Sequence, residues 1–182
     1  LETPLGENAF VATEARGTEG ISSLFAFTVS AISSRPSIEP KDLLGKSVTL
    51  SLARPGGSRR YVNGIVTAFS AGAFTRNDYR LYTMVVSPSL WLAQRTSDHK
   101  VFQEKTVVAI AEQLLADSDV AFEKKLTGTY ETCEYRVQFG ETDFDFLQRI
   151  LAEEGIFYFF KHTNGSHKLV LTDNASAYAD CL

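Results

Sequence analysis

Cysteine is scarce in this 182-residue sequence, which contains only Cys133 and Cys181. Two cysteines cannot form a dense disulfide framework or a zinc-ligand spacing, so we expect free thiols in a protein that folds in the cytoplasm. Long apolar runs are also missing, because no stretch of 18 or more apolar residues occurs. We therefore expect no stable membrane insertion, and no N-terminal segment has the pattern of a cleaved signal.

An excess of basic residues is missing as well. The sequence has 18 basic and 22 acidic side chains and a net charge of −4, so nucleic acid is not an expected partner. The charge is unevenly divided, because residues 1–95 hold 10 basic and 7 acidic groups whereas residues 96–182 hold 8 and 15. Chance, two separate modules or complementary faces in an assembly would each explain this asymmetry.

Apolar and aromatic residues are plentiful. They make up 44% and 12% of the sequence, with 13 Phe, which excludes disorder and supports a sizeable core. The length is compatible with one large domain or two small ones. Because the chain begins without Met and ends soon after a strand-like segment, we expect a piece of a longer protein.

The first half has the pattern of antiparallel strands. Large apolar residues alternate with small or polar ones in four segments: residues 24–32, 46–53, 60–70 and 78–87. Residues 55–58 (PGGS) predict a hairpin turn, and Gly64 inside a strand predicts a bulge or a close backbone approach. We therefore predict an antiparallel β-barrel over residues 1–95.

The second half mixes helices with strands. Apolar stripes at helical spacing predict helices over residues 106–117 and 142–154, capped by Thr106 and Thr142, with Gly155 ending the second helix. Short strands are predicted at residues 120–122, 135–139, 156–160 and 167–172. The predicted fold class is thus mainly β with an α/β part. Residues 96–182 form an α+β subdomain that leads toward a second barrel not contained in this chain.

No acidic residues have the arrangement of a catalytic or metal site. Glu141, Asp143 and Asp145 lie close in sequence, but they lack the glycine turn and the final glutamate of a calcium loop. Asp143 and Asp145 instead suit the positive N-terminal end of a helix. Glu153 and Glu154 are neighbours on a helix and point about 100° apart, so they do not face one substrate together.

The histidines and Cys133 also form no recognisable site. His162 and His167 flank a predicted Asn-Gly hairpin turn and are placed to pair across it, but with His99 they are the only histidines. Cys133 has no base near it in sequence, and the motifs of serine hydrolases, dinucleotide-binding proteins and P-loop proteins are missing. We expect no catalytic residue, no metal and no cofactor.

Four consecutive aromatic residues, Phe157, Tyr158, Phe159 and Phe160, form an unusual run. They cannot all face one side of a strand, so either both faces are buried or one face meets another chain. Packing against the 142–154 helix and a subunit interface both remain open. Trp91, the single tryptophan, is a further candidate for packing or for an interface.

Several runs together resemble the VgrG spike proteins of type VI secretion. They are LLGK (43–46), YVNGIV (61–66), PSLWL (88–92), VFQEKTV (101–107) and, most specifically, QFGETDFDFLQRILAEEGIFYFF (138–160). Ala152 replaces one acidic position of the family pattern. The resemblance spans essentially the whole chain, and it extends more weakly to phage late-control D proteins.

This resemblance implies a structural protein and not an enzyme. Three copies of the full-length protein would form a hub on the hexameric Hcp tube, while the PAAR tip protein and effectors would be carried by a C-terminal spike outside this chain. The protein would assemble in the bacterial cytoplasm and be secreted by the type VI apparatus toward a target cell. Alternatives are a baseplate hub of a phage or tailocin, a nucleic-acid-binding barrel and a hydrolase domain, which needs a pocket that joins a nucleophile or acid to an orienting partner.

Overall fold

The computed structural model describes residues 1–177, which form two compact units. The first unit holds residues 1–20, 24–88 and 162–167, and the second holds residues 21–23, 89–161 and the chain from residue 168 onward. Strands predominate, and both α-helices belong to the second unit. The predicted class, mainly β with an α+β part, is confirmed.

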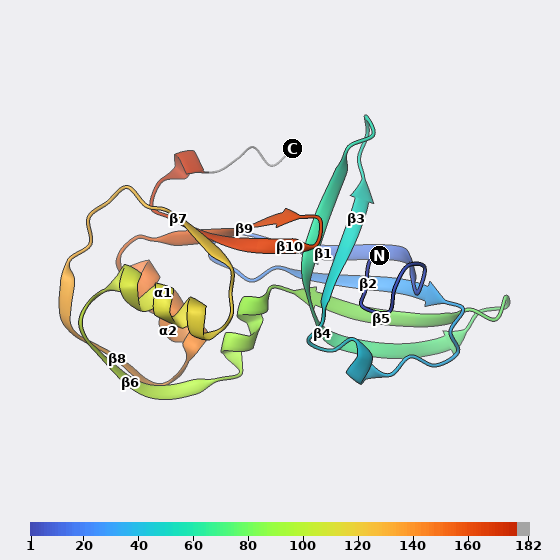
Figure 1. The fold of residues 1–182 in the computed structure, drawn as a ribbon, viewed down its shortest axis with the longest axis horizontal. Coiled ribbons are helices and arrows are strands. Elements are labelled where there is room, and N and C mark those ends of the chain that lie inside the picture. Colours follow the sequence, from blue (N-terminus) through green and yellow to red (C-terminus); the bar gives the residue numbers. More distant parts are fainter. Residues whose placement is uncertain (178–182) are drawn as a thin grey trace. The chain divides into compact units, whose positions relative to one another are not determined.

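Five antiparallel strands form the sheet of the first unit. They are β1 (Val11–Thr18), β2 (Ala26–Ser33), β3 (Ser47–Ala53), β4 (Arg59–Phe74) and β5 (Arg80–Ser87), in the spatial order β1-β2-β5-β4-β3. A 3₁₀ helix, η1 (Pro40–Asp42), precedes β3. Figure 1 shows the long β4 turning from the side of β3 to the side of β5, which curls the sheet into a half-barrel.

The change of partner along β4 depends on a glycine and a bulge. β4 pairs with β3 up to Ile65 and with β5 from Ile65 onward, and the register shifts between Val66 and Ala68. A Cβ atom at Gly64 would lie only 2.5 Å from the carbonyl oxygen of Ser87, so no larger residue fits without a shift of the backbone. The close approach predicted at Gly64 is therefore confirmed, and the bulge follows it along the strand.

The core of the first unit is formed mainly by the inward side chains of the sheet. Alternate residues of β2 and β5 are buried, as the period of a strand requires. The rings of Phe10, Phe69 and Tyr82 cluster with centroids 5.4–6.4 Å apart. The Tyr82 hydroxyl donates a hydrogen bond of 3.2 Å to the Arg35 carbonyl, so its polar end is satisfied inside the core.

The second unit combines two small sheets with two helices. Its elements are η2 (Ser89–Gln94), β6 (Ser97–Thr106), α1 (Val107–Asp117), β7 (Phe122–Lys125), β8 (Thr132–Thr142), α2 (Asp143–Glu153), β9 (Phe157–Thr163), β10 (Ser166–Thr172) and η3 (Ala175–Ala177). β6 and β8 form a two-stranded antiparallel ribbon, and the other sheet has the order β7-β10-β9, with β7 and β10 parallel. Figure 1 shows α1 and α2 beside the ribbon. The turn end of the β9–β10 hairpin, His162–His167, belongs to the first unit.

The predicted helix signals are confirmed. Thr106 accepts a hydrogen bond from the Ala109 amide, and Thr142 accepts one from the Asp145 amide, so both threonines cap their helices as expected. Gly155, two residues after the end of α2, has φ +68°, a backbone conformation that favours glycine. The stripe predicted on α2 is buried: Phe144, Leu147, Ile150 and Leu151.

Other local predictions differ from the structure. The strand β6 was not predicted, and its Phe102 stacks on Phe146 of α2 at 5.4 Å between ring centroids, which buries a helix residue outside the predicted stripe. The short helix predicted after Pro88 is the 3₁₀ helix η2. The strand predicted at residues 120–122 runs instead from Phe122 to Lys125, because its parallel pairing with β10 sets its limits.

Candidate interaction surfaces

The aromatic run lies on β9 and divides between core and surface. Tyr158 is buried, and Phe157, Phe159 and Phe160 are half-buried. The Ser22 amide donates a hydrogen bond of 2.8 Å to the Tyr158 carbonyl, so a segment distant in sequence lines this strand. Burial raises the pKa of the Tyr158 hydroxyl, which stays protonated. Tyr158 is therefore a packing residue, while the three phenylalanines keep part of their surface exposed.

Trp91 lies in η2 and is half-buried. The Arg95 guanidinium lies over the indole ring, 4.2 Å from its centroid. This cation–π contact covers part of one ring face within the second unit. Part of the side chain remains accessible to solvent.

The β6–β8 ribbon has one packed face and one exposed face. On the packed face, Phe102 contacts α2 and the Gln138 amide donates a hydrogen bond of 2.7 Å to Asp143. The opposite face, here called the ribbon face, consists of His99, Val101, Gln103, Tyr135, Val137 and Phe139. In it Val101 and Val137 are direct cross-strand partners, as are His99 and Phe139, whose rings lie 4.9 Å apart. The sequence predicts a strand at residues 135–139 but not this surface, because β6 is not predicted.

Large apolar side chains dominate the ribbon face. The exposed fractions are 58% for Val101, 58% for Tyr135, 45% for Val137 and 79% for Phe139. None of its six residues is Asp, Glu, Lys or Arg. Single exposed apolar residues are common, but a contiguous exposed group is typical of a binding surface.

A buried polar cluster lies in the first unit, where the hairpin turn meets β4. The Asn63 amide donates a 3.2 Å hydrogen bond to Nδ1 of His162, and the Asn63 carboxamide oxygen lies 2.9 Å from Nδ1 of His167. Nδ1 of His162 thus accepts, whereas Nδ1 of His167 donates, which sets the two tautomers. The Asn63 side-chain nitrogen donates to Ser47, Val48 and Thr49 on β3.

The two imidazoles in this cluster are held neutral. Burial lowers the pKa of His162 to about 4 and that of His167 to about 4. Their ring centroids are 6.3 Å apart, so the histidines lie across the hairpin as predicted, but Asn63 connects them. Glu19 is the nearest carboxylate to His162, at 3.6 Å from Nε2. The cluster is built as a structural network and not as a metal site.

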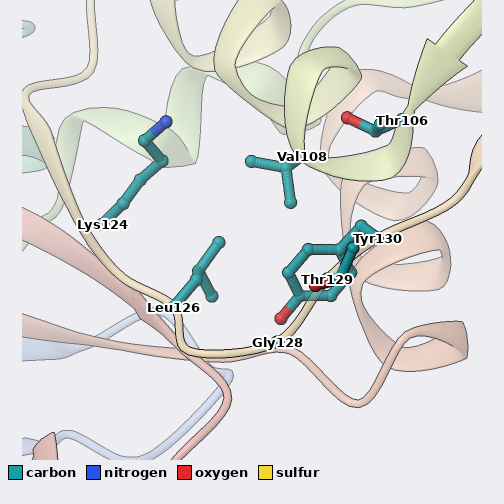
Figure 2. Close-up of a pocket in the computed structure, with 7 residues that line it drawn as sticks. All are labelled: Thr106, Val108, Lys124, Leu126, Gly128, Thr129 and Tyr130. Atoms are coloured by element: carbon teal, nitrogen blue, oxygen red, sulfur yellow. The ribbon is translucent and has the colours of Figure 1, made fainter.

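A pocket of about 420 Å³ lies in the second unit (Figure 2). Its lining residues are Thr106, Val108, Lys124, Leu126, Gly128, Thr129 and Tyr130. The Tyr130 hydroxyl donates a hydrogen bond of 2.8 Å to Asp173. Burial is the main cause, and this hydrogen bond the second, of a rise in the pKa of Tyr130 to about 12. The Gly128 amide and other donors lower the pKa of Asp173 to about 2. Lys124 pairs with Glu112, so the two titratable groups of the lining are engaged by neighbours and are not poised for catalysis.

The remaining polar candidates are dispersed in the structure. Glu141 pairs with Arg149, Asp143 accepts hydrogen bonds from Thr96 and Gln138, and Asp145 receives one from Thr142. Among the residues that the structure describes, no group of three or more His, Cys, Asp and Glu side chains is arranged to hold a metal ion.

Among the described residues, Glu153, Glu154 and Cys133 form no site either. Glu153 and Glu154 both pair with Arg136. Cys133 is a free, half-buried thiol, and Cys181 lies outside the described residues.

The curled sheet and the helix-bearing second unit define a tail-hub fold, and comparisons with known proteins agree. The model of the phage tail baseplate hub (GPD) family matches residues 18–182, and the chain belongs to this family. It is 39% identical to the type VI secretion system spike protein VgrG1c of Pseudomonas aeruginosa and 38% identical to VgrG1a of the same organism. Each match covers 98% of this chain but only 24% and 28% of those proteins, respectively.

A solved structure shows the same fold. The E. coli c3393 protein, described as a component of the type VI secretion system with structural similarity to the T4 bacteriophage tail proteins gp27 and gp5, superimposes with a TM-score of 0.89. The sequence identity is 24%, and the match covers 98% of this chain and 50% of that chain. The chain thus spans about a quarter of the length of the curated relatives that it matches and half of this solved chain.

Proposed function

We propose that this chain is the hub part of a type VI secretion spike, a structural component of a contractile injection apparatus. The observation that carries the proposal is the 39% identity over 98% of the chain to a spike protein. The packing supports it, because the most specific sequence run, residues 138–160, builds the core of the second unit through α2, Gly155 and β9. The run is a folding element and not a set of reactive side chains.

The proposed role has no enzymatic component in this region. A hydrolase needs a nucleophile or acid joined to an orienting partner in a pocket. Tyr130 and Lys124, the titratable residues of the pocket lining, are held by Asp173 and Glu112. We therefore expect effector activities to be supplied by other parts of the apparatus.

The proposed assembly is a homotrimer of the full-length protein that rests on the Hcp tube, with a PAAR tip protein and effectors carried by the spike. Phe157, Phe159, Phe160 and Trp91 are candidate contact residues, because each keeps part of its aromatic surface exposed. We propose assembly in the cytoplasm and secretion by the type VI apparatus. None of the helices among the described residues is long and apolar enough to span a membrane.

The first test is the mass of the full product of this gene in solution, measured by light scattering. We expect a trimer, and a trimer that retains Hcp in a binding assay supports the spike assignment. A stable monomer contradicts it. The family also includes phage tail hubs, so a trimer that ignores Hcp but binds the tube protein of a neighbouring phage-like gene cluster favours the phage or tailocin alternative.

A further inference from the structure

We propose that the ribbon face is a contact surface for a second copy of this chain, and that it packs on the outward side of the first unit's sheet in that copy. This inference rests on the proposed function, since a hub of identical subunits needs such a contact. It assigns the contact to particular residues on each copy.

Strand pairing and packing determine that the ribbon face is the exposed face of the two strands. Its strands are fixed in register by nine cross-strand residue pairs, from Ser97 with Thr142 to Thr106 with Thr132. The opposite side is held on α2 by the Phe102–Phe146 stack and the hydrogen bond from Gln138 to Asp143. A one-residue slip would bury the exposed row and break these contacts. The ribbon therefore presents its apolar residues outward in a fixed register.

A matching surface lies on the outward side of the first unit's sheet. Val11, Ile32 and Leu81 are consecutive cross-strand partners on β1, β2 and β5 and form an apolar row. Val11 and Leu81 are exposed, and Ile32 is half-buried. Two strand surfaces with such rows can pack face to face, about 10 Å apart, as sheets do in a sandwich.

The net charges of the two units favour this row, and not the ribbon face of another copy, as the surface that the ribbon face contacts. The described part of the first unit has nine basic and seven acidic side chains, whereas that of the second unit has nine and fourteen. Two ribbons face to face would bring two acidic units together, but a ribbon on a first unit joins opposite charges.

Exposed acidic residues flank the ribbon face. Glu104 and Glu134 are exposed near the Tyr135 end of the ribbon face, and neither has an ion pair among the described residues. A contact between unlike surfaces is heterologous, and such contacts generate closed rings when the rotation closes.

The first experiment compares self-association of the 182-residue chain and of the full gene product by sedimentation equilibrium. The test variant combines Val101→Ser, Val137→Ser and Phe139→Ser, and the control is Leu92→Ser, which removes from η2 an apolar residue about as exposed as Val137. We expect the triple variant to weaken association by at least about tenfold, as loss of central contact residues does. The control should leave it unchanged, and all variants should keep the melting temperature of the parent chain.

A cross-linking experiment tests the pairing of unlike surfaces. Cys133 and Cys181 are replaced by serine, and a Val137→Cys chain is mixed with a Leu81→Cys chain under oxidising conditions. We expect the predominant disulfide to join the two different chains. Disulfides that form only between two Val137→Cys chains would overturn the proposal in favour of a symmetric ribbon contact.

The outcomes separate this inference from the proposed function. If the full product is a trimer and the triple variant is equally trimeric, the ribbon contact is refuted while the hub assignment stands. If the parent full product is a monomer, the hub assignment fails together with the contact. Binding of the ribbon face to a different protein, without any self-association, would also overturn the inference.

Discussion

The turn end of the β9–β10 hairpin and the β6–β8 ribbon are opposite exceptions to the rule that polar side chains are exposed and apolar side chains are buried. The hairpin end buries polar groups, His162 and His167 with Asn63, in the first unit. The ribbon exposes Val101, Val137 and other apolar groups in the second. Hydrogen bonds with Asn63 compensate most of the polar cluster within the chain. The exposed apolar face has no partner within the described part of the chain, so it indicates an interaction outside the chain.

Lowering the pH should have the largest effect on the free energy of unfolding, because it protonates the buried His162 and His167. Their pKa is about 4 in the fold and 6.5 when unfolded, so the stabilisation is fully present above pH 6.5 and is lost as the pH falls through about 4. The free energy of unfolding, measured with urea, should fall by several kcal/mol over this window, since one pKa unit corresponds to about 1.4 kcal/mol. In a His162→Gln/His167→Gln variant this part of the pH dependence should disappear; an unchanged slope would show that the histidines are not its source.

Leu147→Ala tests the ordinary apolar core that lies under the ribbon. Leu147 is 1% exposed on α2, so its truncation should cost about 2–5 kcal/mol through lost burial and a residual cavity. Thermal and urea unfolding measure the loss. Gln148→Ala is not a suitable control, because Gln148 binds the Ser22 carbonyl; Asp117→Ala, at the exposed end of α1, is preferable. A normal melting temperature for Leu147→Ala would contradict the assigned helix face.

Asn63→Ala should cost about 1–3 kcal/mol, because it leaves buried partners on β3 and on His167 without their hydrogen bonds. Equilibrium unfolding gives the free-energy change. Asn77→Ala, in the exposed β4–β5 turn, is the matched control. If both alanine variants are equally stable, the polar cluster adds nothing to the stability of the first unit.

Val137→Ser should have the smallest effect on stability, within about 0.5 kcal/mol, because the side chain is on the exposed ribbon face. This sharpens the comparison with the hairpin end, where the loss of the Asn63 side chain is expected to cost more. The measurement is urea unfolding at low protein concentration, where self-association does not contribute. A loss of several kcal/mol would mean that the ribbon face is part of the monomer's core.

Local signals in the sequence predicted the elements that depend on neighbouring residues. Thr142, the apolar stripe of α2 and Gly155 predict that helix because a cap, a period and a terminator all lie within one segment. β6 was missed because Lys100, Val101 and Phe102 give no clean alternation of apolar and polar residues. Its strand conformation depends on pairing with β8 about 35 positions away.

The polar cluster shows a similar limit. The Asn-Gly turn predicts that His162 and His167 lie across a hairpin, but nothing local indicates that both contact Asn63. The contacts join residues 99 and 104 positions apart. In the same way, the alternation of Tyr135, Val137 and Phe139 predicts a strand but not which face is exposed. Only the packing of α2 against the other side decides that.

The assignment of His162–His167 to the first unit has a consequence for protein synthesis. Asn63 leaves the ribosome long before its partner His167, which follows 104 positions later. At a translation rate of about 5–20 residues per second, the delay is roughly 5–20 s. During that time the nascent sheet lacks the imidazoles that satisfy Asn63, so the first unit cannot reach its final state until the hairpin of the second has been made.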